Sequence, residues 1–398
     1  MLSKKFLLLV VILASAFYFW CIHYEACQIA YNDFERGMAY YNNKDFKKAV
    51  PLLLKAAEEG DVKAQYHLGM MYEKGFGVSK KMAKAESWYR KAAEQGLVEA
   101  QTHLGFMYKE GKGVSQDIKQ AFQWFYTAAE QGDRQAQIII GKMYHEGEGV
   151  TQNIENAVQW YRKAAAQGDV QYQFKLGLMY FQGVDITEDV SQAINWFSKA
   201  AEKGHVEAQY HLAGIYYSGT GGVKKDFSQA IQWYRKAAEQ SYAKAQFHLG
   251  VMYENGEGVI QDVKKAAQWY RKAAEQELAD AQFKIGLMYY DGKGFPKSFF
   301  DANLWFSKAA EQGHVKAQNN IGLLYYEGNG VPQDFKKAAE WYRKAAEQGN
   351  VDAQYNLAVM YNKGQGVSKN LTKAQKWFRK AAEQGDVQAQ RVLEDLSK

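Results

Sequence analysis

The chain contains 398 residues, of which 47% are apolar and 24% are charged, a composition typical of folded rather than disordered proteins. Its formal net charge is +6, and the charges are dispersed as mixed-sign pairs, such as Arg90 with Glu94, which argues against nucleic acid as a partner. Only 3 prolines are present and alternating β-branched runs are missing, so we expect an all-helical protein.

The N-terminal segment has the layout of an export signal. Lys4 and Lys5 precede an apolar run over residues 6–22, and the Ala-Ser-Ala sequence at 14–16 has the small-x-small form that signal peptidase accepts. Two interpretations stay open. Cleavage after Ala16 would give a periplasmic or secreted protein, whereas residues 6–22 are also just long enough to act as an uncleaved signal anchor. Both place the rest of the chain on the non-cytoplasmic side of the membrane.

Residues 61–96 form a sequence repeat that recurs along the rest of the chain. The glutamine of its A-Q-Y-H-L-G core returns every 36 residues, apart from one step of 37 between Gln209 and Gln246. A fixed period of this size is the signature of a solenoid of stacked two-helix repeats. The recurring glutamines are Gln65, Gln101, Gln137, Gln173, Gln209, Gln246, Gln282, Gln318, Gln354 and Gln390.

The spacing of apolar residues predicts two helices in each repeat. The first contains Leu68 on its packing face and ends at Gly75, because glycine readily adopts the positive φ of a helix C-terminus. The second runs over about residues 83–95. Gly69 allows close packing, and we expect a tryptophan of the second helix to fill the space between layers. The tryptophan recurs as Trp88, Trp124, Trp160, Trp196, Trp233, Trp269, Trp305, Trp341 and Trp377.

The pattern A-Q-x-x-L-G-x-M-Y-x-x-G-x-G-V, followed by A-x-x-W-Y-x-K-A-A-E-Q-G, resembles the Sel-1-like repeat family, which is related to the tetratricopeptide repeats. The resemblance covers residues 61–398. It implies an all-α, right-handed α/α superhelical solenoid that acts as an adaptor or scaffold. Departures from the pattern are local: Asp185, Ser241 and Glu277 each replace a glycine of a turn.

The predicted organisation beyond the export signal at residues 1–27 has three parts. Residues 28–60 form a degenerate, tetratricopeptide-like first repeat with a shorter loop. Residues 61–385 form nine Sel-1-like repeats. Residues 386–398 form a capping helix, because Glu394 replaces the small residue of the other copies and a terminal repeat needs a polar outer face.

Three features that suggest chemistry have simpler interpretations. The Gly-x-Gly sequences follow helices and lack a P-loop lysine, so we interpret them as helix caps. His67, His103, His211 and His248 share one repeat position, but neighbouring repeats are too far apart for them to share one metal ion. Ser241 and Lys244 form a lone Ser-x-x-Lys without the partner motifs of a β-lactam site. We therefore expect no enzyme activity, cofactor or metal.

The candidate partner-binding residues lie on a stripe of the first helices, opposite the packing face. The stripe comprises positions one, five and eight after each repeat glutamine, which align on one face of a helix. In tetratricopeptide-like solenoids the first helices line the concave side, so the stripe would form an aromatic groove; the alternative is that these residues belong to the core. The candidates are Tyr66, Met70, Phe106, Phe174, Leu178, Phe181, Tyr210, Tyr217, Phe247, Phe283, Tyr290, Tyr326 and Tyr355.

The sequence thus predicts a monomeric, non-catalytic scaffold for protein–protein interaction, exported across a membrane or anchored in it. The expected partner is a protein or an extended peptide in the concave groove, with no nucleic acid and with membrane contact only through an uncleaved N-terminal segment. The alternative is an envelope enzyme or enzyme subunit that acts on peptide, cell-wall or β-lactam substrates.

Overall fold

The computed structural model describes residues 32–396. The predicted signal peptide or anchor, with its cleavage position after Ala16, lies outside the described residues. Within the described part of the chain, every helix is too short or too polar to cross a bilayer.

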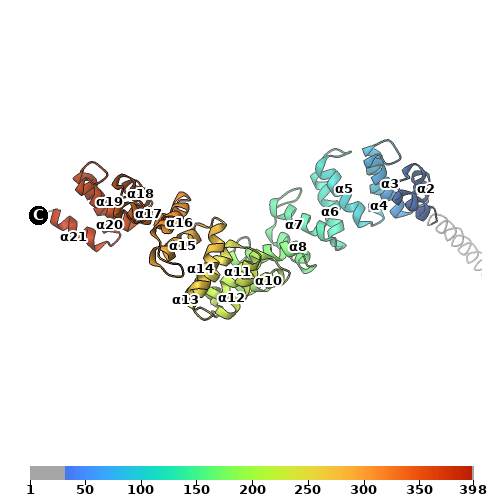
Figure 1. Ribbon diagram of the computed structural model, residues 1–398. Helices are drawn as coiled ribbons and strands as arrows, with labels where there is room; N and C mark the ends of the chain where they lie inside the picture. Colours follow the sequence, from blue (N-terminus) through green and yellow to red (C-terminus); the bar gives the residue numbers. More distant parts are fainter. Residues whose placement is uncertain (1–31, 397–398) are drawn as a thin grey trace, which may run out of the picture. The chain divides into compact units, whose positions relative to one another are not determined.

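The described residues form helices joined by short connections, with no β-strand among residues 32–396, so the all-α prediction is confirmed (Figure 1). A helix over residues 32–42 opens the series. It is followed by α2 (Phe46–Glu58), α3 (Val62–Lys74), α4 (Met82–Glu94), α5 (Val98–Glu110), α6 (Ile118–Glu130), α7 (Arg134–Glu146), α8 (Ile154–Ala166), α9 (Val170–Gln182), α10 (Val190–Glu202), α11 (Val206–Ser218), the 3₁₀ turn η1 (Thr220–Gly222), α12 (Phe227–Glu239), α13 (Ala243–Asn255), α14 (Val263–Glu275), α15 (Ala279–Asp291), α16 (Phe299–Glu311), α17 (Val315–Glu327), α18 (Phe335–Glu347), α19 (Val351–Lys363), α20 (Leu371–Glu383) and α21 (Val387–Leu396).

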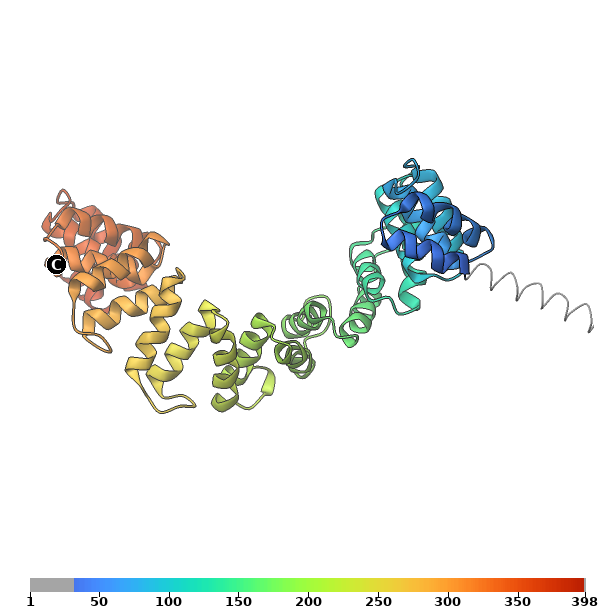
Figure 2. The ribbon, with the colours of Figure 1, turned by 45° about the vertical axis from the view of Figure 1, so that its right-hand side comes forward.

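Each repeat contributes a first helix, odd-numbered from α3 and here called the A helix, and a second, even-numbered B helix. The chain divides into two compact units, the first ending at Glu188 and the second beginning at Asp189. Within each unit, every helix packs on the next helix in the sequence as an antiparallel neighbour (Figures 1 and 2). Each unit is therefore an α-solenoid.

Local sequence determines where each A helix begins and ends. The Asp61 carboxylate accepts a hydrogen bond from the backbone N–H of Ala64 at 2.7 Å and so caps the start of α3. Gly75 ends the helix with a φ of 78°, in the left-handed region. Ser241 and Glu277, which replace closing glycines, retain positive φ values of 64° and 64°. These substitutions therefore preserve the turn, at a cost in backbone strain.

The space beneath the A helices is filled by a different aromatic residue from the one that the sequence suggested. A Cβ atom on Gly69 would lie 2.6 Å from Cδ1 of Tyr89, whose side chain is fully buried. Trp88 is only half-buried, and Lys91 Nζ lies 4.2 Å from its ring centroid. The prediction that the tryptophan fills this space is wrong in this repeat: the next residue does so, and the glycine admits its ring.

The repeat glutamines connect successive repeats. Gln65 is 4% exposed; its Nε2 donates to the carbonyl of Ala57 on the preceding B helix at 3.1 Å, and its Oε1 accepts from Nε2 of Gln95 at 2.8 Å. All ten repeat glutamines donate to the equivalent carbonyl. Each glutamine thus donates to a carbonyl near the C-terminus of the preceding B helix, and eight of the ten also accept an amide from the glutamine at the end of the following B helix.

We predict that Gln282→Leu destabilises the second unit by about 2 kcal/mol, because the carbonyl of Ala274 keeps only its bond from the N–H of Glu277 and Nε2 of Gln312 loses its acceptor. Urea unfolding followed by circular dichroism measures the loss. Gln268→Ala, at an exposed position of α14, is the control and is expected to change the midpoint little. An equal, small effect of both substitutions would show that the glutamine contact does not stabilise the stack.

Stability is also expected to fall at acid pH, through the histidine that caps α17. His314 Nδ1 accepts from the N–H of Ala317 at 3.1 Å, which requires an unprotonated Nδ1. Burial lowers the pKa of His314, although Asp280 opposes the shift. The unfolded chain then binds a proton more readily than the folded chain, so stabilisation present above pH ~6.5 is lost as the pH falls.

His314→Asn is expected to reduce this pH dependence, because Asn350 caps α19 in the same way at 2.8 Å. The measurement is the urea midpoint at pH 7.5 and at pH 5.0, for wild type and variant. The wild type should lose more stability than the variant over this interval. An identical loss in both proteins would contradict the assignment.

Candidate functional site

The predicted stripe residues occupy the described A helices at intermediate depth. All thirteen are half-buried except Phe106, which is 36% exposed. They therefore contact neighbouring helices while keeping part of each side chain accessible, so neither the groove nor the core interpretation describes them completely. Their role in partner binding stays a prediction.

Stripe residues of successive repeats meet in a pocket of about 190 Å³ between α17 and α19. Leu323 and Tyr326 line it from α17, and Tyr355 and Val359 line it from α19. The buried Tyr342 of α18 also contributes to its wall. Glu327 and Asn356 complete the lining, so apolar and aromatic side chains of the kind that anchor protein interfaces lie beside two polar ones.

A second pocket, of about 430 Å³, lies where the beginnings of α15 and α17 approach α13. Phe247 and Phe283 supply aromatic surface, and the Phe283 ring stacks on His314 with 4.5 Å between centroids. His314 Nε2 lies 3.4 Å from Oδ1 of Asp280, and Lys284 also lines the pocket. Aromatic surface and charges of both signs therefore adjoin on the A helices.

Position eight of the stripe also connects repeats. Glu73 accepts from the hydroxyl of Tyr89 at 2.8 Å, and its Oε2 lies 2.8 Å from Nε2 of His103 in the next repeat. Burial alone would raise the pKa of Glu73, but hydrogen bonds from Lys74, Tyr89 and His103 together lower it to about 2. The glutamate is therefore ionised at neutral pH and holds two repeats together.

Position two after the glutamine, which the sequence analysis did not include in the stripe, lies beside it. His248 stacks on the buried Tyr234 with 5.0 Å between centroids and an interplanar angle of 7°, and its Nε2 lies 3.3 Å from the hydroxyl of Tyr210. Burial lowers the pKa values of His67, His211 and His248. The histidines are thus partly packed helix residues. Their recurrence at one repeat position was the signal that they face this surface.

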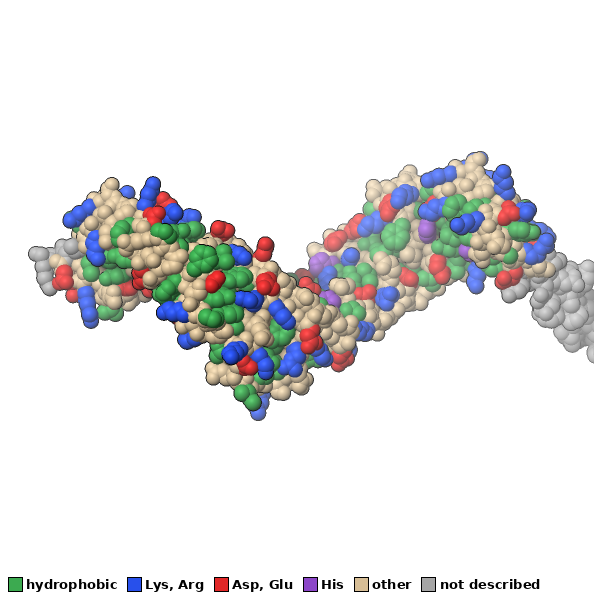
Figure 3. All heavy atoms as spheres, viewed as in Figure 1, with side chains coloured by type: hydrophobic (Ala, Val, Ile, Leu, Met, Phe, Trp, Pro, Cys, Tyr) green, Lys and Arg blue, Asp and Glu red, His purple; other side chains and the backbone are tan. Residues whose placement is uncertain are grey.

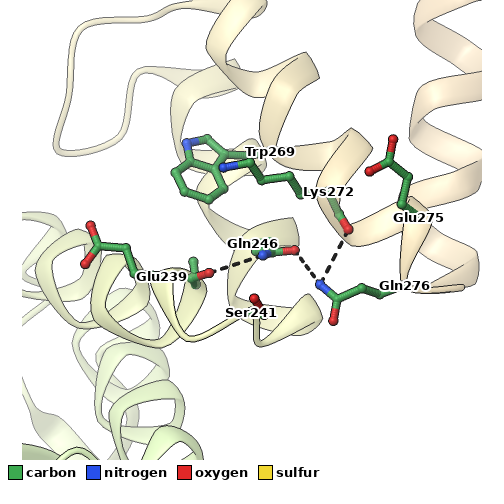
Figure 4. Close-up of a pocket in the computed structure, with 8 residues that line it drawn as sticks. Glu239, Ser241, Gln246, Trp269, Lys272, Glu275 and Gln276 are labelled. Atoms are coloured by element: carbon green, nitrogen blue, oxygen red, sulfur yellow. Dashed lines mark hydrogen bonds between the residues drawn. The ribbon is translucent and has the colours of Figure 1, made fainter.

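Ser241 lines an open pocket of about 610 Å³ on the other side of the repeats, together with Gln246, Trp269 and Gln276 (Figure 4). Lys244, the second residue of the Ser-x-x-Lys sequence, is not among the lining residues. A similar pocket of about 440 Å³ recurs one repeat later, with Glu277 at the position of Ser241. Because the pocket persists when serine is replaced by glutamate, it results from the stacking of repeats rather than from a serine-based site.

Charges on the surface are mixed. Figure 3 shows lysine and arginine side chains interspersed with aspartate and glutamate over the visible face of both units, with apolar patches between them. Among the described residues, no group of three histidine, cysteine, aspartate or glutamate side chains lies close enough to hold a metal ion.

Comparison with known proteins agrees with this geometry. The model of the Sel1 repeat matches ten segments, at residues 43–61, 62–97, 98–133, 134–169, 170–205, 206–242, 243–278, 279–314, 315–350 and 351–386. A search of curated proteins found no match.

Two solved structures are similar over most of the chain. One is a protective antigen of uropathogenic Escherichia coli with an SLR fold, 40% identical over 91% of this chain and 78% of that protein, with a TM-score of 0.75. The other is a Sel1 repeat protein from Oxalobacter formigenes, 34% identical over 82% of this chain and 93% of that protein, with a TM-score of 0.67. Repeat matches and fold together show that the chain belongs to the Sel1 repeat family.

Proposed function

We propose that this protein is an exported, non-catalytic scaffold that binds an extended segment of a protein partner along the stripe of its A helices. Sel1 repeat proteins are generally protein-interaction scaffolds, and their fold is typically non-catalytic. The pocket between α17 and α19 is the observation that supports the use of the stripe most directly, because residues from two successive repeats frame it.

The half-buried state of the stripe favours binding. Tyr326 and Tyr355 are held in place by neighbouring helices, so ordering them against a partner costs little conformational entropy. The Tyr326 hydroxyl is fixed further by a hydrogen bond to Oε1 of Gln365 in the next repeat, at 3.2 Å. Preorganised aromatic side chains with accessible faces are typical anchors of protein interfaces.

We predict that replacing both Tyr326 and Tyr355 by alanine weakens partner capture at least about tenfold, because hot-spot aromatics each contribute about 2 kcal/mol or more. Immobilised protein would capture partners from an envelope extract, with quantitative mass spectrometry to compare variants. The affinity of the most enriched protein would then be measured with the purified partner. Circular dichroism would verify that the variants are folded.

The matched control replaces Phe300 and Leu304 by alanine. These side chains are 69% and 46% exposed on the B helix α16, so the change removes apolar surface outside the stripe. Capture should be unchanged in this control. Equal capture by wild type and by the variant with Tyr326 and Tyr355 replaced would show that the stripe is not the binding surface.

Export is supported by the basic residues and apolar run at the N-terminus and fits the description of the E. coli relative as a protective antigen.

Alkaline phosphatase is active only outside the cytoplasm, so a fusion of this enzyme after Lys398 reports export. We predict that the fusion is active with the full chain and inactive when residues 1–22 are deleted. An N-terminus at Phe17 would indicate cleavage, and an intact chain in the membrane fraction would indicate an anchor. Inactivity of the full-length fusion would contradict export.

A further inference from the structure

In the second unit, the lysine two residues after one repeat glutamine forms an ion pair with a glutamate of the protein itself. Lys284 Nζ lies 3.0 Å from Oε2 of Glu254, the position-eight residue of the preceding A helix. The same carboxylate oxygen accepts from the hydroxyl of Tyr270 at 2.5 Å, and Lys284 lies 5.8 Å from the centroid of that ring. The ammonium group, the buried tyrosine and the glutamate form one compensated cluster.

Lys175 occupies the equivalent position on α9 of the first unit but lacks the equivalent partner. Its Nζ lies 4.2 Å from the ring centroid of Tyr161 and 5.7 Å from that of Tyr172. The residue that corresponds to Glu254 is His145. Within residues 32–396, no carboxylate lies within salt-bridge distance of Lys175, so its ammonium rests on two aromatic rings without a direct counter-ion.

The neighbouring charges do not compensate for the missing glutamate. Lys142, an exposed residue at position five of α7, adds a second positive charge on the same surface. The nearest acidic groups are engaged elsewhere or more distant: Asp185 Oδ2 lies 3.7 Å from Nε2 of His145, and Glu146 is exposed. Burial and the charge of Lys142 lower the pKa of Lys175, and the attraction of Asp185 and Glu146 does not offset this.

We propose that Lys175, with Lys142 beside it, is an acceptor for an aspartate or glutamate side chain of the bound partner segment, whose carboxylate pairs with Lys175 as Glu254 pairs with Lys284. This inference rests on the proposed function, since it assumes that a peptide segment lies along the stripe. It also specifies the partner, which must present an acidic residue where it crosses α7 and α9. The carboxylate would complete a charge pair in a half-buried setting, where such pairs determine which partner is accepted.

The test uses two labelled peptides of equal length, EFEYEFE and QFQYQFQ, with blocked termini, and measures their binding to the full chain by fluorescence anisotropy at low salt. Both supply aromatic side chains, and only the first supplies carboxylates. We expect the acidic peptide to bind wild type about tenfold more tightly, in line with a close charge pair at an interface. Its addition should also slow amine-reagent labelling of Lys175, measured by mass spectrometry.

Three variants test the assignment. Lys175→Gln should remove the preference for the acidic peptide. Lys284→Gln, the matched control, should keep it, because Glu254 already neutralises Lys284. His145→Glu should also remove it while the protein stays folded, because the new carboxylate competes for Lys175.

The possible outcomes separate the two proposals. Equal binding of both peptides to wild type, or a preference that survives Lys175→Gln, overturns the acceptor proposal and leaves the stripe as a binding surface. If neither peptide binds, both proposals are wrong: Lys175 is not an acceptor for an acidic side chain, and the stripe does not bind extended aromatic peptides.

Discussion

The buried amide of the repeat glutamine is the contact on which the stacking of repeats depends. Gln101, for example, is 2% exposed and donates to the carbonyl of Ala93 at 3.1 Å while it accepts from Gln131 at 2.7 Å. An unpaired buried amide costs about 1–3 kcal/mol, so a repeat that slips against its neighbour loses both bonds. The register between repeats is therefore determined by a polar group, whereas alanines and aromatic rings supply the apolar burial.

The helices could be predicted from the sequence because period and capping residues act locally. The identity of the buried aromatic could not, because Trp88 and Tyr89 are adjacent and both lie near the inner face of α4. Helical periodicity cannot separate residues that are one position apart. Lys91, three residues after the tryptophan, lies over the indole, but the equivalent Lys163 lies over Trp160, which is only 5% exposed, so the lysine does not reveal which ring is accessible.

The sequence predicted which helices carry the candidate site, but not how far its side chains are buried. The stripe at positions one, five and eight is on the expected helices, yet its residues are half-buried because each A helix also contacts the next repeat. The pair between Glu73 and His103 spans 30 residues of sequence. Such a contact depends on how far one repeat rotates against another, which no residue pattern within a single repeat determines. Position two was missed for the same reason.

Similar repeats can still differ in what they bind, because the differences lie in how charges are compensated. Where position eight is glutamate, as in Glu254, the lysine of the next repeat is neutralised within the protein and adds stability. Where it is histidine, as in His145, the equivalent Lys175 retains an uncompensated charge that costs folding free energy. A partner that supplies the missing carboxylate recovers this free energy on binding. In a solenoid of near-identical repeats, specificity would then lie where an internal pair is incomplete.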